Sequence, residues 1–95
     1  MKPVRLSLLA RKEIQRIGED IAADKPQAAA AFGRQPIQRC LNLADAPEGY
    51  GLKPEFGQGV RGVTVAPYLI LYRIREQDIL ILSVRHGARK PVAFK

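Results

Sequence analysis

Cysteine and histidine are almost missing from this sequence, which has one of each, Cys40 and His86. A single cysteine excludes an internal disulfide framework. One cysteine and one histidine also cannot supply the four nitrogen and sulfur ligands of a structural zinc site. We therefore expect no metal site and no cofactor, and this cysteine usage favours the reducing cytoplasm.

Long hydrophobic runs are also missing. The most apolar stretches, such as residues 78–84 with their run of four aliphatic side chains, are far shorter than the roughly 20 residues of a membrane-spanning helix. The short apolar patch at residues 6–10 is too brief for the apolar core of a secretory signal. We therefore expect neither a membrane partner nor export.

Negative charge is scarce, since 9 Asp and Glu residues stand against 16 Lys and Arg residues and leave a net charge of +7. Such a balance favours an acidic partner, which can be nucleic acid, an acidic protein or anionic lipid. The length of 95 residues, 46% of them hydrophobic and 26% charged, predicts one folded domain over residues 1–95.

Hydrophobic periodicity predicts a strand and two helices in the first half. Residues 2–6 alternate as a short strand, and Ser7 can cap the helix that follows. Apolar residues then recur at helical spacing, at Ala10, Ile14, Ile17 and Ile21. The sequence Asp-Lys-Pro at residues 24–26 ends this helix. Pro26 starts a second helix that runs to about Ala44, with Cys40 in its apolar stripe and a bend near residues 33–36 caused by Pro36.

The second half changes to a period of two. Residues 45–59 hold two Pro and four Gly and predict a long irregular connection, which in a compact domain is usually functional. Strands are expected at residues 60–66, 68–74 and 78–85, joined by short turns into an antiparallel meander. The expected fold is α+β with the order β-α-α-β-β-β, a helical hairpin packed on one face of a mostly antiparallel sheet.

Basic residues concentrate on the predicted strands and the tail. Arg61, Arg73, Arg85 and Arg89 form one cationic face if their strands are neighbours. His86 is either a general acid or base or a structural residue at a strand end, and Tyr68 and Tyr72 either pack in the core or stack on bases. The carboxylates of the first helix, Glu13, Glu19 and Asp20, are expected on its solvated face.

Several short motifs follow one another along nearly the whole chain. They are Ala10 with Glu13-Ile14, Ile17 and Ile21; Asp24-Lys25-Pro26 with Ala28-Ala29 and Phe32; Leu41, Leu43, Pro47 and Gly51; Gly59-Val60-Arg61; residues 67–73 (PYLILYR); and Val84-Arg85-His86-Gly87-Ala88-Arg89. In this order and spacing they resemble the ParE-like branch of the RelE/ParE superfamily, the toxins of bacterial type II toxin–antitoxin modules.

The resemblance implies a toxin that inhibits DNA gyrase, without catalytic residues of its own, and that a ParD-like antitoxin neutralises with an acidic C-terminal segment in a hetero-oligomer. RelE-like relatives instead cut mRNA on the ribosome, and here Arg61, Arg85 and His86 would stand at their basic positions. A third alternative is a non-toxic relative that only binds antitoxin, because Gly62 follows Arg61 where a second basic residue is common and Pro36 interrupts the second helix.

The candidate contact residues fall into two groups. Those expected to bind the target are Arg61, Arg73, Arg85, His86, Arg89 and Lys90. Those expected to bind the antitoxin are Ile14, Ile17, Ile21, Arg16, Phe32 and Arg39. Because Gly87 permits a sharp exit from the last strand, the cations of the tail are expected to project beside the sheet instead of packing beneath it. The alternative is that Arg85 or Arg89 pairs with a carboxylate such as Glu13 or Asp78 to hold the tail.

Overall fold

The computed structural model describes residues 2–24, 42, 47–65, 67–87 and 94, with the side chains of residues 21–24 excepted. Most of the predicted second helix, including Phe32, Arg39, Cys40 and the bend at Pro36, lies outside these residues. Arg89 and Lys90 of the tail lie outside them as well.

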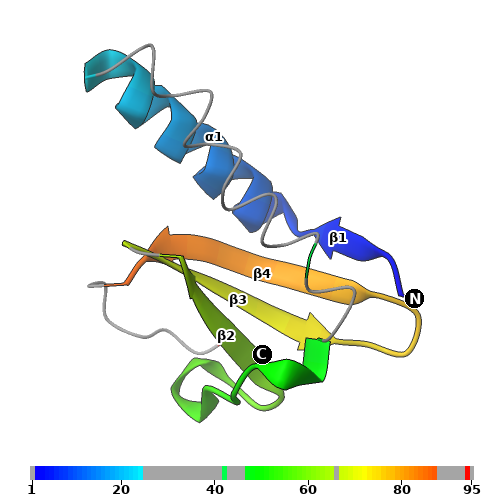
Figure 1. Ribbon diagram of the computed structural model, residues 1–95. Coiled ribbons are helices and arrows are strands. Elements are labelled where there is room, and N and C mark those ends of the chain that lie inside the picture. Colours follow the sequence, from blue (N-terminus) through cyan, green and yellow to red (C-terminus); the bar gives the residue numbers. More distant parts are fainter. Residues whose placement is uncertain (1, 25–41, 43–46, 66, 88–93, 95) are drawn as a thin grey trace.

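The sheet has four strands in the order β1-β4-β3-β2 (Figure 1). They are β1 (Val4–Leu6), β2 (Val60–Val65), β3 (Tyr68–Ile74) and β4 (Ile79–His86). β2, β3 and β4 form the predicted antiparallel meander, whereas β1 lies parallel to β4 at the edge of the sheet. The mostly antiparallel α+β prediction is confirmed, and each predicted strand agrees with the observed one to within two residues.

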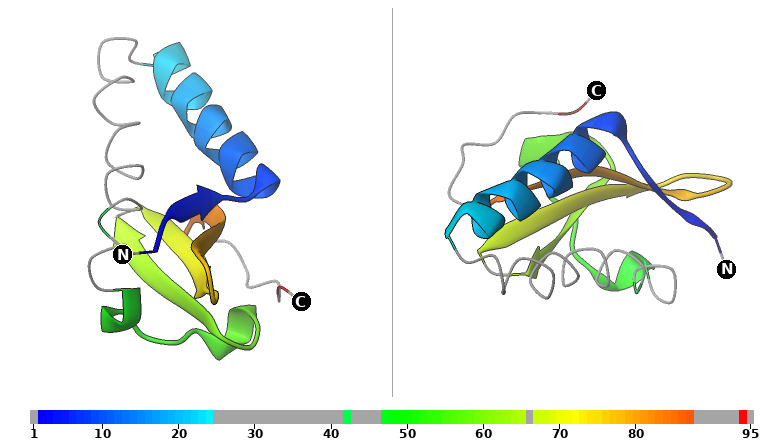
Figure 2. Two further views of the ribbon diagram at one scale, coloured as in Figure 1. Left: turned by 90° about the vertical axis from the view of Figure 1, so that its right-hand side faces the viewer. Right: turned by 90° about the horizontal axis from the view of Figure 1, so that it is seen from above.

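Helix α1 (Leu8–Asp24) begins where the sequence predicts it. The Ser7 hydroxyl accepts a hydrogen bond from the Ala10 amide at 3.0 Å, which is the N-cap geometry of a helix. Ala10 is fully buried, and Ile14 and Ile17 pack against the same core. The apolar stripe therefore lies against the sheet, and the two views of Figure 2 show α1 crossing one side of it.

Each side of the sheet has its own hydrophobic core. The side under α1, here called the helix side, buries Ala10, Val63, Ile70, Tyr72, Ile79, Ile81 and Val84. The opposite side, here called the far side, buries Phe56, Val60, Leu71 and Leu82, with Leu69, Leu80 and Phe94 packed against them. The sheet is therefore the middle layer, and a side chain's position along its strand decides which core it joins.

The described part of the long connection, residues 47–59, is irregular as predicted. It contains two short 3-10 helices, η1 (Pro47–Gly49) and η2 (Pro54–Phe56). Between them Lys53 donates its amide to Val60, and Gly62 donates its amide to Gly51. The connection thus runs along the outer edge of β2 and covers it.

Candidate functional site

The other edge of the sheet is closed in an unusual way, because β1 pairs with only Ile79–Ile81 of β4. Beyond that point the start of α1 takes over: the Ser7 amide donates to Ile81 and its hydroxyl donates to Leu82, both at 2.9 Å. Six residues after Ser7, Glu13 Oε1 accepts from the Val84 amide at 3.1 Å and from the Ser83 hydroxyl at 2.7 Å. A helix and its carboxylate therefore stand where a further strand would otherwise pair.

A groove of about 410 Å³ lies along this edge, between α1 and the ends of β3 and β4. Its lining residues are Lys12, Glu13, Arg16, Ile17, Asp20, Tyr68, Val84, Arg85 and His86. Arg16 forms an exposed ion pair with Asp20 at 3.3 Å, and the rings of Tyr68 and His86 meet edge to face at 6.1 Å. The groove thus combines cations, an imidazole and an apolar floor.

Three of the residues predicted to bind an antitoxin can be placed in relation to this groove. Ile17 and Arg16 line it, and Ile14 packs into the helix-side core. Ile21 belongs to α1, although its side chain lies outside the described residues.

Arg61 holds the long connection against the helix side. Its Nη1 donates to the Tyr50 carbonyl at 2.7 Å and to the Glu48 carbonyl at 3.4 Å. The neighbouring Tyr72 hydroxyl donates to the Pro47 carbonyl. Burial raises the pKa of Tyr72 to about 12, an effect that the Arg61 cation opposes and Tyr50 strengthens. These contacts make Arg61 and Tyr72 one structural unit.

Arg73 and Arg85 lie on the far side. Arg73 donates to the carbonyls of Gln58 and Phe94, at 3.2 and 2.8 Å. Arg85 is only 8% exposed, and its guanidinium lies 5.5 Å from the ring centroid of Phe56 and 5.3 Å from that of Phe94.

The prediction of a single cationic face is therefore wrong. Arg61 pairs with Tyr72 of the helix-side core, whereas Arg73 and Arg85 lie on the far side. Arg85, which comes before the tail, alternates with the exposed His86 and packs beneath the strands. Arg89 and Lys90, the tail cations predicted to project beside the sheet, lie outside the described residues. The alternative pairing is nearer to the observed geometry: Arg85 Nε donates to Ser83 Oγ at 3.1 Å, and that hydroxyl donates to Glu13.

The role of Glu13 was missed by the sequence reasoning, which placed it on the solvated face. Its position three residues after Ala10 and four before Ile17 puts it at the border of the apolar stripe, and this was the available signal. Ser83 was missed because the even alternation of β4 is broken. The pairing shifts between Leu71 and Tyr72, which oppose Ser83 and Ile81, so that Leu82 is an extra residue.

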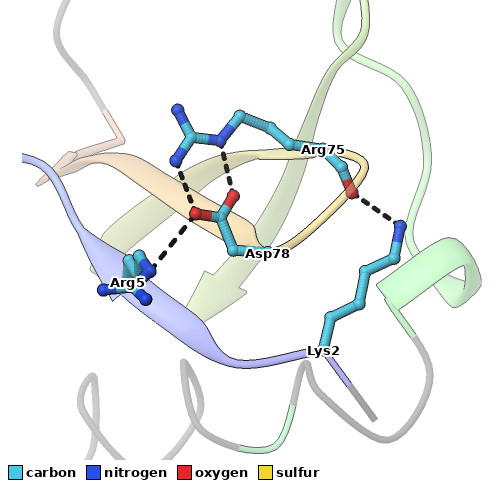
Figure 3. Close-up of polar contacts among 4 residues, drawn as sticks. All are labelled: Lys2, Arg5, Arg75 and Asp78. Carbon is cyan, nitrogen blue, oxygen red and sulfur yellow. Dashed lines mark hydrogen bonds and ion pairs between the residues drawn. The ribbon is translucent and has the colours of Figure 1, made fainter.

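A second polar cluster fixes β1, and through it the start of α1 (Figure 3). The carboxylate of Asp78 accepts two hydrogen bonds of 2.5 Å from Arg75 and lies 3.4 Å from Arg5 Nε. Lys2 donates to the Arg75 carbonyl at 2.6 Å. The Arg75 hydrogen bonds are the main cause that holds the pKa of Asp78 below its usual value.

Within the described ranges no group of three or more His, Cys, Asp and Glu residues could hold a metal ion. No helix of the described part is long and apolar enough to cross a membrane.

Two solved structures share this architecture. The chain is similar to a chain of the chromosomal ParDE toxin–antitoxin system from P. aeruginosa, with a TM-score of 0.80 and 18% identity over 90% of this chain and 96% of that chain. It is also similar to a chain of the toxin–antitoxin complex RelBE2 from Mycobacterium tuberculosis, with a TM-score of 0.63 and 25% identity over 93% of each chain. A comparison with curated proteins found no match.

These similarities define the fold class, a small α+β domain that this chain shares with chains of two toxin–antitoxin complexes. The model of the family described as the ParE toxin of the type II toxin–antitoxin system parDE matches residues 4–91. The chain belongs to this ParE toxin family.

Proposed function

We propose that this toxin inhibits DNA gyrase by binding it in the cytoplasm, and that an antitoxin with an acidic segment neutralises it in a hetero-oligomer. The observation that carries the choice of a binding mechanism is the separation of Arg61, Arg85 and His86. Arg61 and His86 pair with residues four apart on β3, a distance of about 13 Å along a strand. Arg85 borders the groove beside His86, but its guanidinium is buried against Phe56 and Phe94 on the far side. These three residues do not converge on one phosphate, as RNA cleavage would require.

His86, with Arg89 and Lys90, remains the proposed contact to the target, because His86 is exposed at the groove. Arg61, Arg73 and Arg85 are proposed to act indirectly, by holding the connection and the far-side core in place. Loss of any of them should therefore affect the fold as well as target binding.

Purified toxin added to a gyrase supercoiling assay and to a translating ribosome tests the proposal. Supercoiling should stop while the mRNA stays intact. His86→Ala should weaken the inhibition, whereas Arg11→Ala, on an exposed part of α1 outside the groove, should leave it unchanged. Site-specific cuts in mRNA with normal supercoiling would overturn gyrase inhibition.

One observation favours the nuclease as a second candidate. His86 meets Tyr68 in the groove that Lys12 and Arg16 also line, so that a base and phosphate-binding cations share one site. In that case His86→Ala should abolish the mRNA cuts. If both gyrase and mRNA are unaffected while antitoxin still binds, the chain is a non-toxic antitoxin-binding relative.

The proposed antitoxin site is the groove, where the cations Lys12 and Arg16 of α1 stand beside the closed edge of β4. An acidic segment would be drawn there electrostatically, which raises the association rate at low salt. With the acidic protein encoded by the neighbouring gene as the probe, Lys12→Glu and Arg16→Glu should slow association, and Arg11→Glu should do so less. Rates that ignore salt and all three substitutions would contradict the electrostatic part.

A further inference from the structure

On the far side, four residues surround Phe94 and are here together called the far-side pocket: Phe56, Gly57, Arg73 and Arg85. The Phe94 amide donates to the Phe56 carbonyl at 2.6 Å, and its own carbonyl accepts from Arg73 Nη2 at 2.8 Å. Gly57 has a φ of +124°, and a Cβ there would stand 2.3 Å from the Phe94 carbonyl oxygen. Only glycine allows this close backbone approach. The pocket therefore holds one residue by both of its backbone groups.

The same pocket selects for an aromatic side chain. The Arg85 guanidinium lies over the Phe94 ring at 5.3 Å and over the Phe56 ring at 5.5 Å. Both distances fall within the range of cation–π attraction, which is stronger when the cation is desolvated. Because Arg85 is buried, an aliphatic residue in the place of Phe94 would leave its guanidinium in contact with the Phe56 ring alone.

A hydrogen-bonded relay connects the pocket with the groove around the edge of β4. Arg85 Nε donates to Ser83 Oγ at 3.1 Å, and Ser83 Oγ donates to Glu13 Oε1 at 2.7 Å. A hydroxyl that donates to a carboxylate becomes a better acceptor for the guanidinium. The charge of Glu13, a groove residue, therefore compensates a buried cation that contacts Phe94 on the other side of the sheet.

We propose that the far-side pocket is a recognition site for an aromatic residue, that Phe94 of the same chain is its resident ligand, and that its occupancy is coupled to Glu13 in the groove. Coupling of this kind is reciprocal by thermodynamic necessity, so a change at either end is felt at the other. The proposal stands on these contacts whatever the toxin's target is.

Hydrogen exchange of the residue-94 amide measures directly how far Phe94 occupies the pocket, because that amide donates to the Phe56 carbonyl. Glu13→Gln keeps the shape and the acceptor oxygen but removes the charge, and it should speed exchange at residue 94 about fivefold. Glu19→Gln is the matched control and should change nothing, because Glu19 lies on the same helix and its hydrogen bond among the described residues is to Gln15 of that helix. Amides of β3 report global unfolding and should be unaffected by both variants.

Three further variants complete the test. Ser83→Ala keeps Glu13 but breaks the relay, and it should match the effect of Glu13→Gln at residue 94. Phe94→Leu should speed exchange at residue 94 and also at the Val84 amide, which Glu13 holds, whereas Phe94→Tyr should preserve both. Faster exchange at every amide alike, or a residue-94 amide that ignores Glu13→Gln and Ser83→Ala, would overturn the coupling. Equal protection in the Leu and Tyr variants would overturn the aromatic selectivity.

Discussion

The two sides of the sheet are closed by different physical means. The helix side is covered by α1, whose aliphatic side chains meet a layer of aliphatic side chains and the buried Tyr72. Among the described residues, the far side is covered by η2 and by Phe94, and a buried arginine lies between the aromatic rings. The helix covers a mostly apolar core, in which the Tyr72 hydroxyl is bonded to Pro47, whereas the thin cover described on the far side relies on hydrogen bonds and on cation–π contacts to residues distant in the sequence.

The largest effect should come from neighbouring residues that belong to the two cores. Ile81 is fully buried on the helix side, and Leu82 is 8% exposed on the far side. Truncations to Ala cost about 2–5 kcal/mol, depending on how well the site collapses. We expect Ile81→Ala near the upper end and Leu82→Ala near the lower end, because the thin cover can relax. Urea unfolding measures both, and equal losses would remove the contrast between the covers.

A smaller loss is expected at Arg85. Arg85→Ala removes a cation between two rings, an interaction of about 2 kcal/mol when desolvated, together with the packing of its aliphatic stem. The free energy of unfolding should fall by about that amount, and Arg85→Lys should not restore it fully, because a lysine lacks the planar guanidinium. A variant of unchanged stability that has lost toxicity would instead make Arg85 a direct target contact.

Alkaline pH should weaken the helix side selectively. The pKa of Tyr72 is raised from 10.0 to about 12, so the folded state keeps a proton that the unfolded chain has already lost. Stability is therefore complete below pH 10 and falls as the pH rises toward 12. Melting curves across this range should show a loss that Tyr72→Phe reduces. An identical alkaline decline in that variant would show that Tyr72 is not its source.

The smallest effect is expected at the cluster that fixes β1 to the turn before β4. The pKa of Asp78 is lowered mainly by its hydrogen bonds to Arg75, so its contribution is present above the ordinary Asp pKa of about 4 and is lost as the pH falls below it. Asp78→Asn should destabilise slightly at neutral pH and flatten the acid side of the stability profile. An acid profile that stays unchanged would assign the acid sensitivity to other carboxylates.

The described strands and α1 were predictable because each carries a local signal, a period of two or of 3.6 and a serine at the helix cap. The parallel pairing of β1 and the side on which each arginine lies were not, because they depend on pairing between distant strands. The extra residue Leu82 breaks the alternation within β4. The burial of Arg85 depends on Phe56 and Phe94, which no spacing along the sequence connects to it.

The closure of β4 by α1 also has a consequence for aggregation. Beyond Ile81, the outer edge of β4 is occupied by Ser7 and by the Glu13 carboxylate, which cannot act as a template for another strand. If α1 lifts away from the sheet while the meander stays intact, residues 82–86 become a bare edge that can pair with the same edge of another molecule. Helix α1 thus protects the toxin from self-association as well as closing its core. Self-association is most favoured when α1 has lifted away from an intact meander.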